Sequence, residues 1–162
     1  MLKFKILEHT ADGKFRAYGN TLEKAFENSA YAMISFMTKD KIKEKIKKTI
    51  KVRGKNKEQL LYNFLEELLF LIDSKNFILS KIKKMKIDEK KLSLDADIVG
   101  DNVRNSHKIR ISEHPKNSTK KQKSFFDVKN YEIFGDVKAV TYNSMFIKKQ
   151  KGRFIIQVVI DL

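Results

Sequence analysis

The sequence predicts an α+β fold: a two-layer sandwich in which two helices pack on one face of a mixed, mainly antiparallel sheet. Two segments place apolar residues at helical spacing, while the other patterned segments alternate as strands do. Each helical segment lies between strand segments in the chain order, which favours helices covering one sheet. With 162 residues, 41% of them hydrophobic, the chain is predicted to form one domain, 1–162, with a substantial core.

The N-terminal part predicts two strands and the first helix. Residues 2–7 alternate, residues 15–19 form a second strand, and Asp12-Gly13 between them is typical of a hairpin turn. Asn20 is the expected N-cap of the first helix, with Glu23 completing a capping box. Apolar and small residues then recur on one helical face: Leu22, Ala25, Phe26, Ser29, Ala30, Met33 and Met37.

A second unit of strand, helix and strands follows. Residues 46–52 alternate with lysines, as in a half-exposed strand, and Asn56 is the predicted cap of the second helix, with Gln59 completing its capping box. Strands are expected at 77–87 and 92–98, the latter with acidic residues on its solvent face. The second helix has the widest apolar stripe in the chain: Leu60, Leu61, Phe64, Leu65, Leu68, Leu69 and Ile72.

The C-terminal third contains an interruption and then the last strands. Residues 102–134 lose the core-forming pattern and include a basic tract at 116–123, which predicts a protruding insertion. Strands resume at 138–143, and 145–147 and 154–160 form a hairpin that turns at 150–152. The last run is apolar and β-branched, as in a buried central strand, and it ends in Asp161.

The composition narrows the functional classes. The formal net charge of +15 favours polyanionic partners through counterion release, although lysines on solvated faces would produce the same value. The absence of cysteine excludes disulfides and thiolate sites. No run resembles a membrane span or a signal peptide, so a cytoplasmic protein without membrane contact is expected.

The sequence contains no recognisable catalytic or cofactor-binding motif. It has no phosphate-cradling glycine loop, no Gly-x-Ser-x-Gly elbow and no His-Glu-x-x-His. Oxygen donors remain in Asp12, Asp161 and the α-carboxylate of Leu162, which meet if the first and last strands are neighbours. Such hard donors suit Ca²⁺ or Mg²⁺ better than Zn²⁺. The alternative is a pair of ordinary exposed acids.

Several segments, in the right order, resemble the archease family. They are EHTAD at 8–12, RAYGNTLEKAFEN at 16–28, EQLL at 58–61, FLEELL at 64–69 and VKAVTY at 137–142. The ending in Asp161 followed by one hydrophobic residue also matches. The resemblance covers nearly the whole chain except the predicted insertion.

This resemblance implies a sandwich of strand-helix-strand-strand modules and a non-enzymatic role. Archeases activate the GTP-dependent, manganese-using tRNA-splicing RNA ligase by promoting its guanylylation and multiple turnover. The family's metal ligands correspond to Asp12, Asp161 and Leu162. Ca²⁺ is the expected ion, with Mg²⁺ and Mn²⁺ as alternatives. The expected partners are the ligase and, indirectly or weakly through the basic surface, tRNA.

Two other functions compete with the activator. One is a basic RNA-binding module without a ligase partner, in which the lysines act and the acids are incidental. The other is a metal-dependent hydrolase in which Asp12 and Asp161 activate water. Tight, steeply salt-dependent RNA binding by the isolated protein favours the RNA-binding module, whereas weak binding alongside stimulation of the ligase favours the activator.

Overall fold

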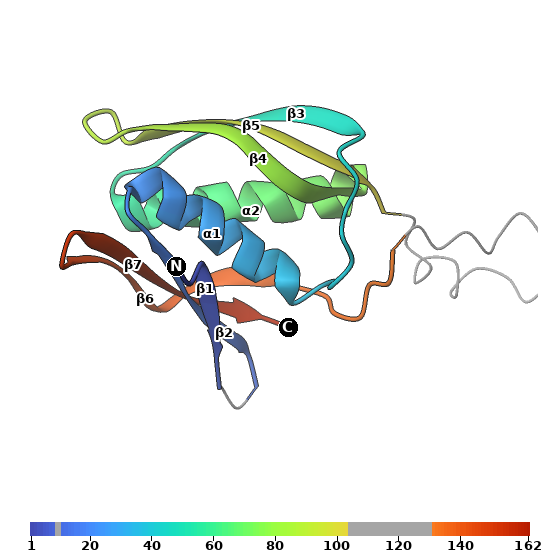
Figure 1. Ribbon diagram of the computed structural model, residues 1–162, viewed down its shortest axis with the longest axis horizontal. Coiled ribbons are helices and arrows are strands. Elements are labelled where there is room, and N and C mark those ends of the chain that lie inside the picture. Colours follow the sequence, from blue (N-terminus) through green and yellow to red (C-terminus); the bar gives the residue numbers. More distant parts are fainter. Residues whose placement is uncertain (9–10, 104–130) are drawn as a thin grey trace, which may run out of the picture.

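Two helices lie between two antiparallel sheets in the computed structural model, which describes residues 1–8, 11–103 and 131–162 (Figure 1). The helices are α1 (Leu22–Ser35) and α2 (Lys57–Lys75). Each helix contacts strands of both sheets. The predicted α+β sandwich, with helices packed on antiparallel strands, is therefore confirmed. No helix in these ranges is long and apolar enough to cross a membrane.

The strands divide between two sheets, where the sequence predicted one. The four-stranded sheet has the order β1-β2-β7-β6, from β1 (Phe4–Leu7), β2 (Gly13–Gly19), β6 (Ala139–Gln150) and β7 (Arg153–Asp161). The three-stranded sheet has the order β3-β5-β4, from β3 (Ile46–Arg53), β4 (Phe77–Asp88) and β5 (Ser93–Asn102). All described pairings are antiparallel. Alternation identifies a strand but not its neighbour, which explains the missed division.

The core lies where the two helices meet the inner faces of the sheets. Phe26 of α1 and Phe64 of α2 are fully buried, and their rings stack with centroids 6.3 Å apart. Phe15 of β2 and Phe77 of β4 are also buried, so each sheet contributes an aromatic side chain to the same core. Burial stabilises each such side chain by about 1.5–3 kcal/mol.

The start of α1 differs from the prediction by one residue. Thr21, not Asn20, is the N-cap, and its Oγ1 accepts a hydrogen bond from Lys24 N at 3.1 Å. Gly19 precedes this cap at a close approach of strand and helix, because a Cβ on Gly19 would lie 2.3 Å from Ala25 N. Both candidate caps are good acceptors, so this packing against β2, rather than residue type, decides which one is used.

The start of α2 agrees with the prediction. Asn56 is the N-cap, and its Oδ1 accepts a hydrogen bond from Gln59 N at 2.7 Å. Gln59 reciprocates, since its Oε1 accepts from Lys55 N at 2.7 Å. The helix ends at Asn76, which adopts the left-handed conformation with φ 53°.

Both ends of the predicted insertion belong to the body of the domain. Val103 is buried, and its N–H donates to Asn76 O at 2.6 Å. On the returning side, Tyr131 Oη donates to Asp101 Oδ2 at 2.6 Å and Phe134 N donates to Met37 O at 3.0 Å. Residues 104–130, with the basic tract, lie outside the described residues.

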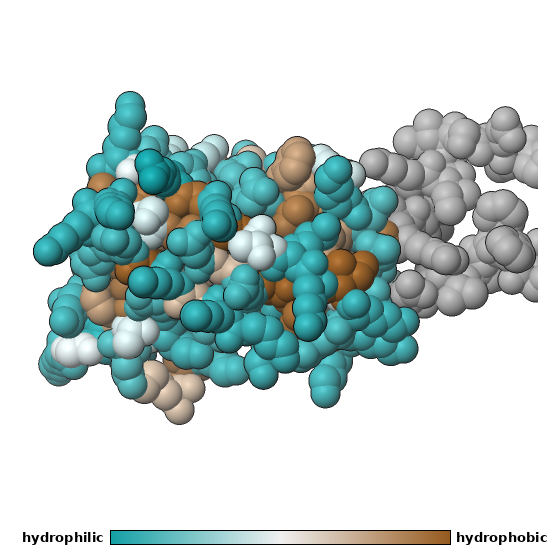
Figure 2. All heavy atoms as spheres, turned by 90° about the horizontal axis from the view of Figure 1, so that it is seen from above, coloured by the Kyte–Doolittle hydropathy of each residue, from teal (hydrophilic) through white to brown (hydrophobic). Residues whose placement is uncertain are grey.

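The outer face of the three-stranded sheet is polar and mixed in charge. Figure 2 looks onto this side and shows mainly hydrophilic side chains. Asp95 and Asp97 of the central strand are exposed there, as predicted. Lys51 Nζ lies 4.0 Å from Asp95 Oδ1, and Thr49 Oγ1 donates to Asp97 Oδ1 at 3.1 Å. Acids and lysines therefore alternate across this face.

Candidate metal site and neighbouring surfaces

The pairing of β2 with β7 brings the two predicted acids opposite one another. The last pair of this ladder is Gly13 with Ile160. One residue further along each strand are Asp12 and Asp161, and side chains that are opposite across antiparallel strands lie on the same face. The second strand, rather than the first, is thus the neighbour of the last, since β1 pairs with β2.

Gly13 determines which face these acids occupy. It is buried toward the helices, where an added Cβ would lie 2.7 Å from Ile160 Cγ1 and 2.9 Å from Phe36 Cε1. Since successive strand residues alternate, Asp12 and Asp161 belong to the opposite, outer face. Gly13 is therefore a strand residue that permits close packing, and its predicted place in a hairpin turn was wrong.

The last residues are held in the middle of the sheet. β7 lies between β2 and β6, Ala139 pairs with Asp161, and Lys138 N donates to Asp161 O at 2.8 Å. Asp161 is exposed, whereas Asp12 is half-buried. Leu162 follows immediately, with its side chain 44% exposed. Two hydrogen-bonded neighbouring strands therefore fix the position of Asp161.

The predicted metal ligands are all carboxylate oxygens. They are the side chains of Asp12 and Asp161 and the α-carboxylate predicted for Leu162. No group of three His, Cys, Asp or Glu side chains suited to a metal occurs within the described part of the chain. The donor chemistry nevertheless fits a hard divalent cation, which takes its other ligands from water or a partner. His9, in the same loop, lies outside the described residues.

A bulge in β6 shapes the sheet beside these acids. Thr141 pairs with Val159, but the next pair is Phe146 with Gln157, so four residues of β6 oppose one of β7. Ser144 in the bulge has φ 54°, and its carbonyl accepts a hydrogen bond from Gln157 Nε2 at 2.8 Å. The sequence predicted an interruption between 143 and 145 but not the bonded bulge, because Gln157 belongs to another strand.

The bulged strand is attached to α2. Tyr142 is 51% exposed and stacks on Tyr62, with ring centroids 4.3 Å apart and planes at 12°. One turn further along the helix, Glu66 Oε1 accepts a hydrogen bond from Val140 N at 2.7 Å. Glu66 lies off the apolar stripe of this helix, and its carboxylate pairs with a backbone N–H of β6. The exposed side of α2 thus supports the four-stranded sheet.

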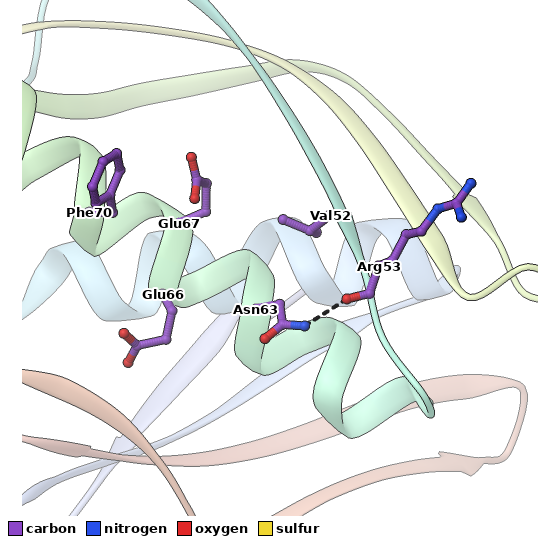
Figure 3. Close-up of a pocket in the computed structure, with 6 residues that line it drawn as sticks. All are labelled: Val52, Arg53, Asn63, Glu66, Glu67 and Phe70. Atoms are coloured by element: carbon purple, nitrogen blue, oxygen red, sulfur yellow. Dashed lines mark hydrogen bonds between the residues drawn. The ribbon is translucent and has the colours of Figure 1, made fainter.

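A shallow pocket of about 430 Å³ opens on the other side of the same helix, next to β3 (Figure 3). A hydrogen bond joins α2 to β3 at this pocket: Asn63 Nδ2 donates to Arg53 O at 2.6 Å. Phe70 is 52% exposed at its edge. Strand and helix both supply the lining: Val52, Arg53, Asn63, Glu66, Glu67 and Phe70. The pocket combines two carboxylates, Arg53 and the exposed ring of Phe70.

Known proteins match the chain along its whole length. The profile described as Archease protein family (MTH1598/TM1083) matches residues 4–162. The chain is 34% identical over 163 residues to "Protein archease" of Sulfurisphaera tokodaii, with 100% of both chains covered. It is 34% identical over 166 residues to "Protein archease" of Pyrococcus furiosus, again with 100% of both covered.

Solved structures share the fold. The solution structure of Methanobacterium thermoautotrophicum protein 1598 superimposes with a TM-score of 0.71 at 31% identity, covering 99% of each chain. The crystal structure of a Thermotoga maritima archease, described as a possible chaperone, gives a TM-score of 0.55 at 17% identity. It covers 98% of this chain and 96% of that one, and at this identity it supports the fold alone.

Proposed function

The chain belongs to the archease family, and we propose that it is a non-enzymatic activator of the GTP-dependent tRNA-splicing RNA ligase. It promotes guanylylation of the ligase and multiple turnover. The observation that carries this proposal is the register of β2 and β7, in which Asp12 and Asp161 follow the Gly13–Ile160 pair beside Leu162. These are the positions to which the family resemblance assigns the metal ligands.

The carboxylates of Asp12, Asp161 and Leu162 would hold a divalent cation, with Ca²⁺ expected and Mg²⁺ or Mn²⁺ as alternatives. When bound, the ion supplies positive charge that attracts an anionic group, such as a partner's carboxylate or a nucleotide phosphate. The chain's own contribution is to orient these oxygens. The ladder between β2 and β7, together with the Lys138–Asp161 hydrogen bond, holds them at the end of two central strands.

The net charge of +15 supports a weak or indirect contact with tRNA as part of the same role. The alternative function is a basic RNA-binding module without a ligase, and the same charge supports it. It leaves the opposed acids without a purpose, and for that reason we favour the activator.

Multiple-turnover ligation by the cognate ligase tests the proposal, with Ca²⁺ binding by calorimetry as a second readout. We expect Asp12→Asn and Asp161→Asn to lose both stimulation and Ca²⁺ binding. Asp95→Asn is the matched control, because it removes an exposed strand acid from the other sheet. Full stimulation by Asp161→Asn would refute the metal-site mechanism while leaving family membership intact.

A further inference from the structure

The outer face of the four-stranded sheet carries cations interleaved with aromatic rings. Gly13, Phe15 and Ala17 of β2 are buried toward the helices, so the residues between them belong to the outer face. The face includes residues from three strands, and we call this set the basic aromatic face: Lys14, Arg16, Tyr18, Phe146, Lys148 and Arg153. We propose that this face binds single-stranded RNA.

The pairing register makes these residues one continuous surface. Arg16 pairs with Gln157, which in turn pairs with Phe146. One row along, Tyr18 pairs with Ile155, which pairs with Lys148. In each row, therefore, a cation lies on one side of β7 and an aromatic ring lies on the other side. The rows lie in the same sheet as Asp12 and Asp161, toward the other end of the strands.

Cation–π contacts order the side chains on this face. The Arg16 guanidinium lies 5.6 Å from the Phe146 ring centroid, and Lys148 Nζ lies 4.4 Å from the same centroid. Arg16 Nε also donates to Gln157 Oε1 at 2.9 Å. The Arg153 guanidinium stacks 4.3 Å from the Tyr18 centroid. Because these groups are already held in place, less conformational entropy is lost when a ligand binds.

The two sheets differ in how their outer cations are neutralised. On the three-stranded sheet, Asp95 and Asp97 lie between lysine-bearing edge strands, and Lys51 forms an ion pair with Asp95. On the basic aromatic face, Arg16 and Arg153 form no ion pair among the described residues. The outer face of the three-stranded sheet is therefore an ordinary lysine-rich, solvated face. The basic aromatic face carries two arginines that form no ion pair with a described acid, and this favours a polyanion.

The rings identify which polyanion fits. Tyr18, Phe146 and Arg153 are half-buried on this face. Surface aromatic and guanidinium planes stack on bases that are unstacked from one another, as they are in single strands, and neighbouring cations contact the backbone phosphates. A duplex hides its base faces, and an acidic peptide offers no planes to stack on. Single-stranded RNA is therefore the ligand whose chemistry uses both components of this face.

The test measures fluorescence anisotropy of a labelled 12-nucleotide oligouridylate with the full-length protein. Arg16→Glu/Lys148→Glu reverses two charges on the basic aromatic face. Lys47→Glu/Lys84→Glu makes the same change in net charge on exposed lysines of the other sheet. We expect the first pair to weaken binding at least about tenfold more than the control pair. It should also lower the slope of log K against log salt by about 1.4, for two lost phosphate contacts.

Tyr18→Leu and Phe146→Leu test stacking without changing the charge. Each should weaken oligouridylate binding by about fivefold or more and leave binding to a 12-base-pair RNA duplex unchanged. Thermal unfolding confirms that each variant is folded. Equal losses in the two charge-reversal pairs, equal affinity for duplex and single strand, or equally tight binding of polyglutamate would each overturn the inference.

This inference deepens the RNA contact within the proposed function, but its assay needs no ligase. The same variants assayed for ligase stimulation separate the two proposals. If the oligouridylate results contradict the expectation while ligase stimulation persists, RNA binding by the basic aromatic face is refuted and the activator role survives. If the wild-type protein does not stimulate the ligase, the activator role fails, and the oligouridylate measurements still decide whether the basic aromatic face binds RNA.

Discussion

Gly13 and Asp12 are sequence neighbours that face opposite sides of the four-stranded sheet. Gly13 lies against Ile160 and Phe36 inside the sandwich, which leaves Asp12 on the outer face opposite Asp161. At the scale of single residues, the candidate metal site therefore depends on a position with no room for a side chain. Two predictions follow from these contacts.

Gly13→Ala should lower the free energy of unfolding by about 1–3 kcal/mol, because the new methyl overlaps Ile160 Cγ1. Urea unfolding measures the change. In Gly13→Ala/Ile160→Ala the overlap with Ile160 is absent and the 2.9 Å approach to Phe36 Cε1 remains. The double variant should therefore lose less stability than the sum of the two single variants. Additive losses would show that Gly13 is required for another reason.

Asp161→Asn should leave the free energy of unfolding within about 1 kcal/mol of wild type without metal, because like charges opposite one another across strands are mildly destabilising. Saturating Ca²⁺ should raise the Tm of the wild-type protein by mass action and have little effect on the variant. Calorimetry with and without Ca²⁺ checks both. A Tm shift of the same size in the variant would remove Asp161 from the ligands.

At the scale of elements, side chains join the end of α1 to the segment that follows residue 130. Thr38 Oγ1 donates to Glu132 O at 2.8 Å, and Glu132 N donates to Asp40 Oδ2 at 2.7 Å. Tyr131 Oη donates to Asp101 Oδ2, at the end of β5, and accepts from Lys43 N at 3.1 Å. The joint thus connects α1, β5 and the segment leading into β6.

Tyr131→Phe should destabilise the protein by about 1.5–3 kcal/mol, because it removes a hydrogen bond to a charged and buried carboxylate. Tyr142→Phe is the control: it removes one hydroxyl from a tyrosine that is 51% exposed and stacked on Tyr62. Chemical denaturation of both variants gives the comparison. Equal effects would mean that the Tyr131 hydroxyl adds nothing to this joint.

The same hydrogen bond predicts a pH dependence. Donation by Tyr131 lowers the pKa of Asp101 from its ordinary 3.8, so the carboxylate is favoured in the folded state. This contribution is complete above the ordinary pKa and is lost as the pH falls through the lower pKa of the folded protein. The stability difference between wild type and Tyr131→Phe should therefore be constant from pH 5 to 7 and shrink below about pH 4. A difference that grows in acid would contradict this linkage.

At the scale of the whole molecule, the two sheets enclose both helices and present different outer faces. One mixes acids with lysines, and the other gathers cations and rings at one end and carboxylates at the other. The ends of the predicted insertion are attached to the body through Val103 and Tyr131. Both points of attachment therefore belong to the body of the domain.

Deletion of residues 116–123 should change the free energy of unfolding by less than about 1 kcal/mol, because loop length enters the closure entropy only logarithmically. Thermal and urea unfolding of the deletion variant check this. Replacing the same residues by a Gly/Ser segment of equal length controls for composition. A large loss in the deletion alone would show that the length of the tract matters, and a large loss in both would place it in the core.

Signals carried by residues close together in the sequence were sufficient to predict the elements. The Asn56 cap, the apolar stripe of α2 and the β6–β7 turn depend on such neighbours; at that turn Lys151 and Gly152 both have positive φ. The acids Asp12 and Asp161 were also identified from their types and positions. The helix cap at Thr21 and the role of Gly13 were not, since packing against another element decides both.

Only the tertiary structure decided which strands are neighbours. Arg16 and Gln157 are 141 residues apart, and Glu66 and Val140 are 74 apart, yet each pair is hydrogen-bonded. Alternation assigns a residue to one side of its own strand and says nothing of the strand beside it. The division into two sheets, the opposition of Asp12 and Asp161 and the basic aromatic face all arise from strand pairing. Pairing is determined by how apolar faces far apart in the chain bury one another, which no local pattern encodes.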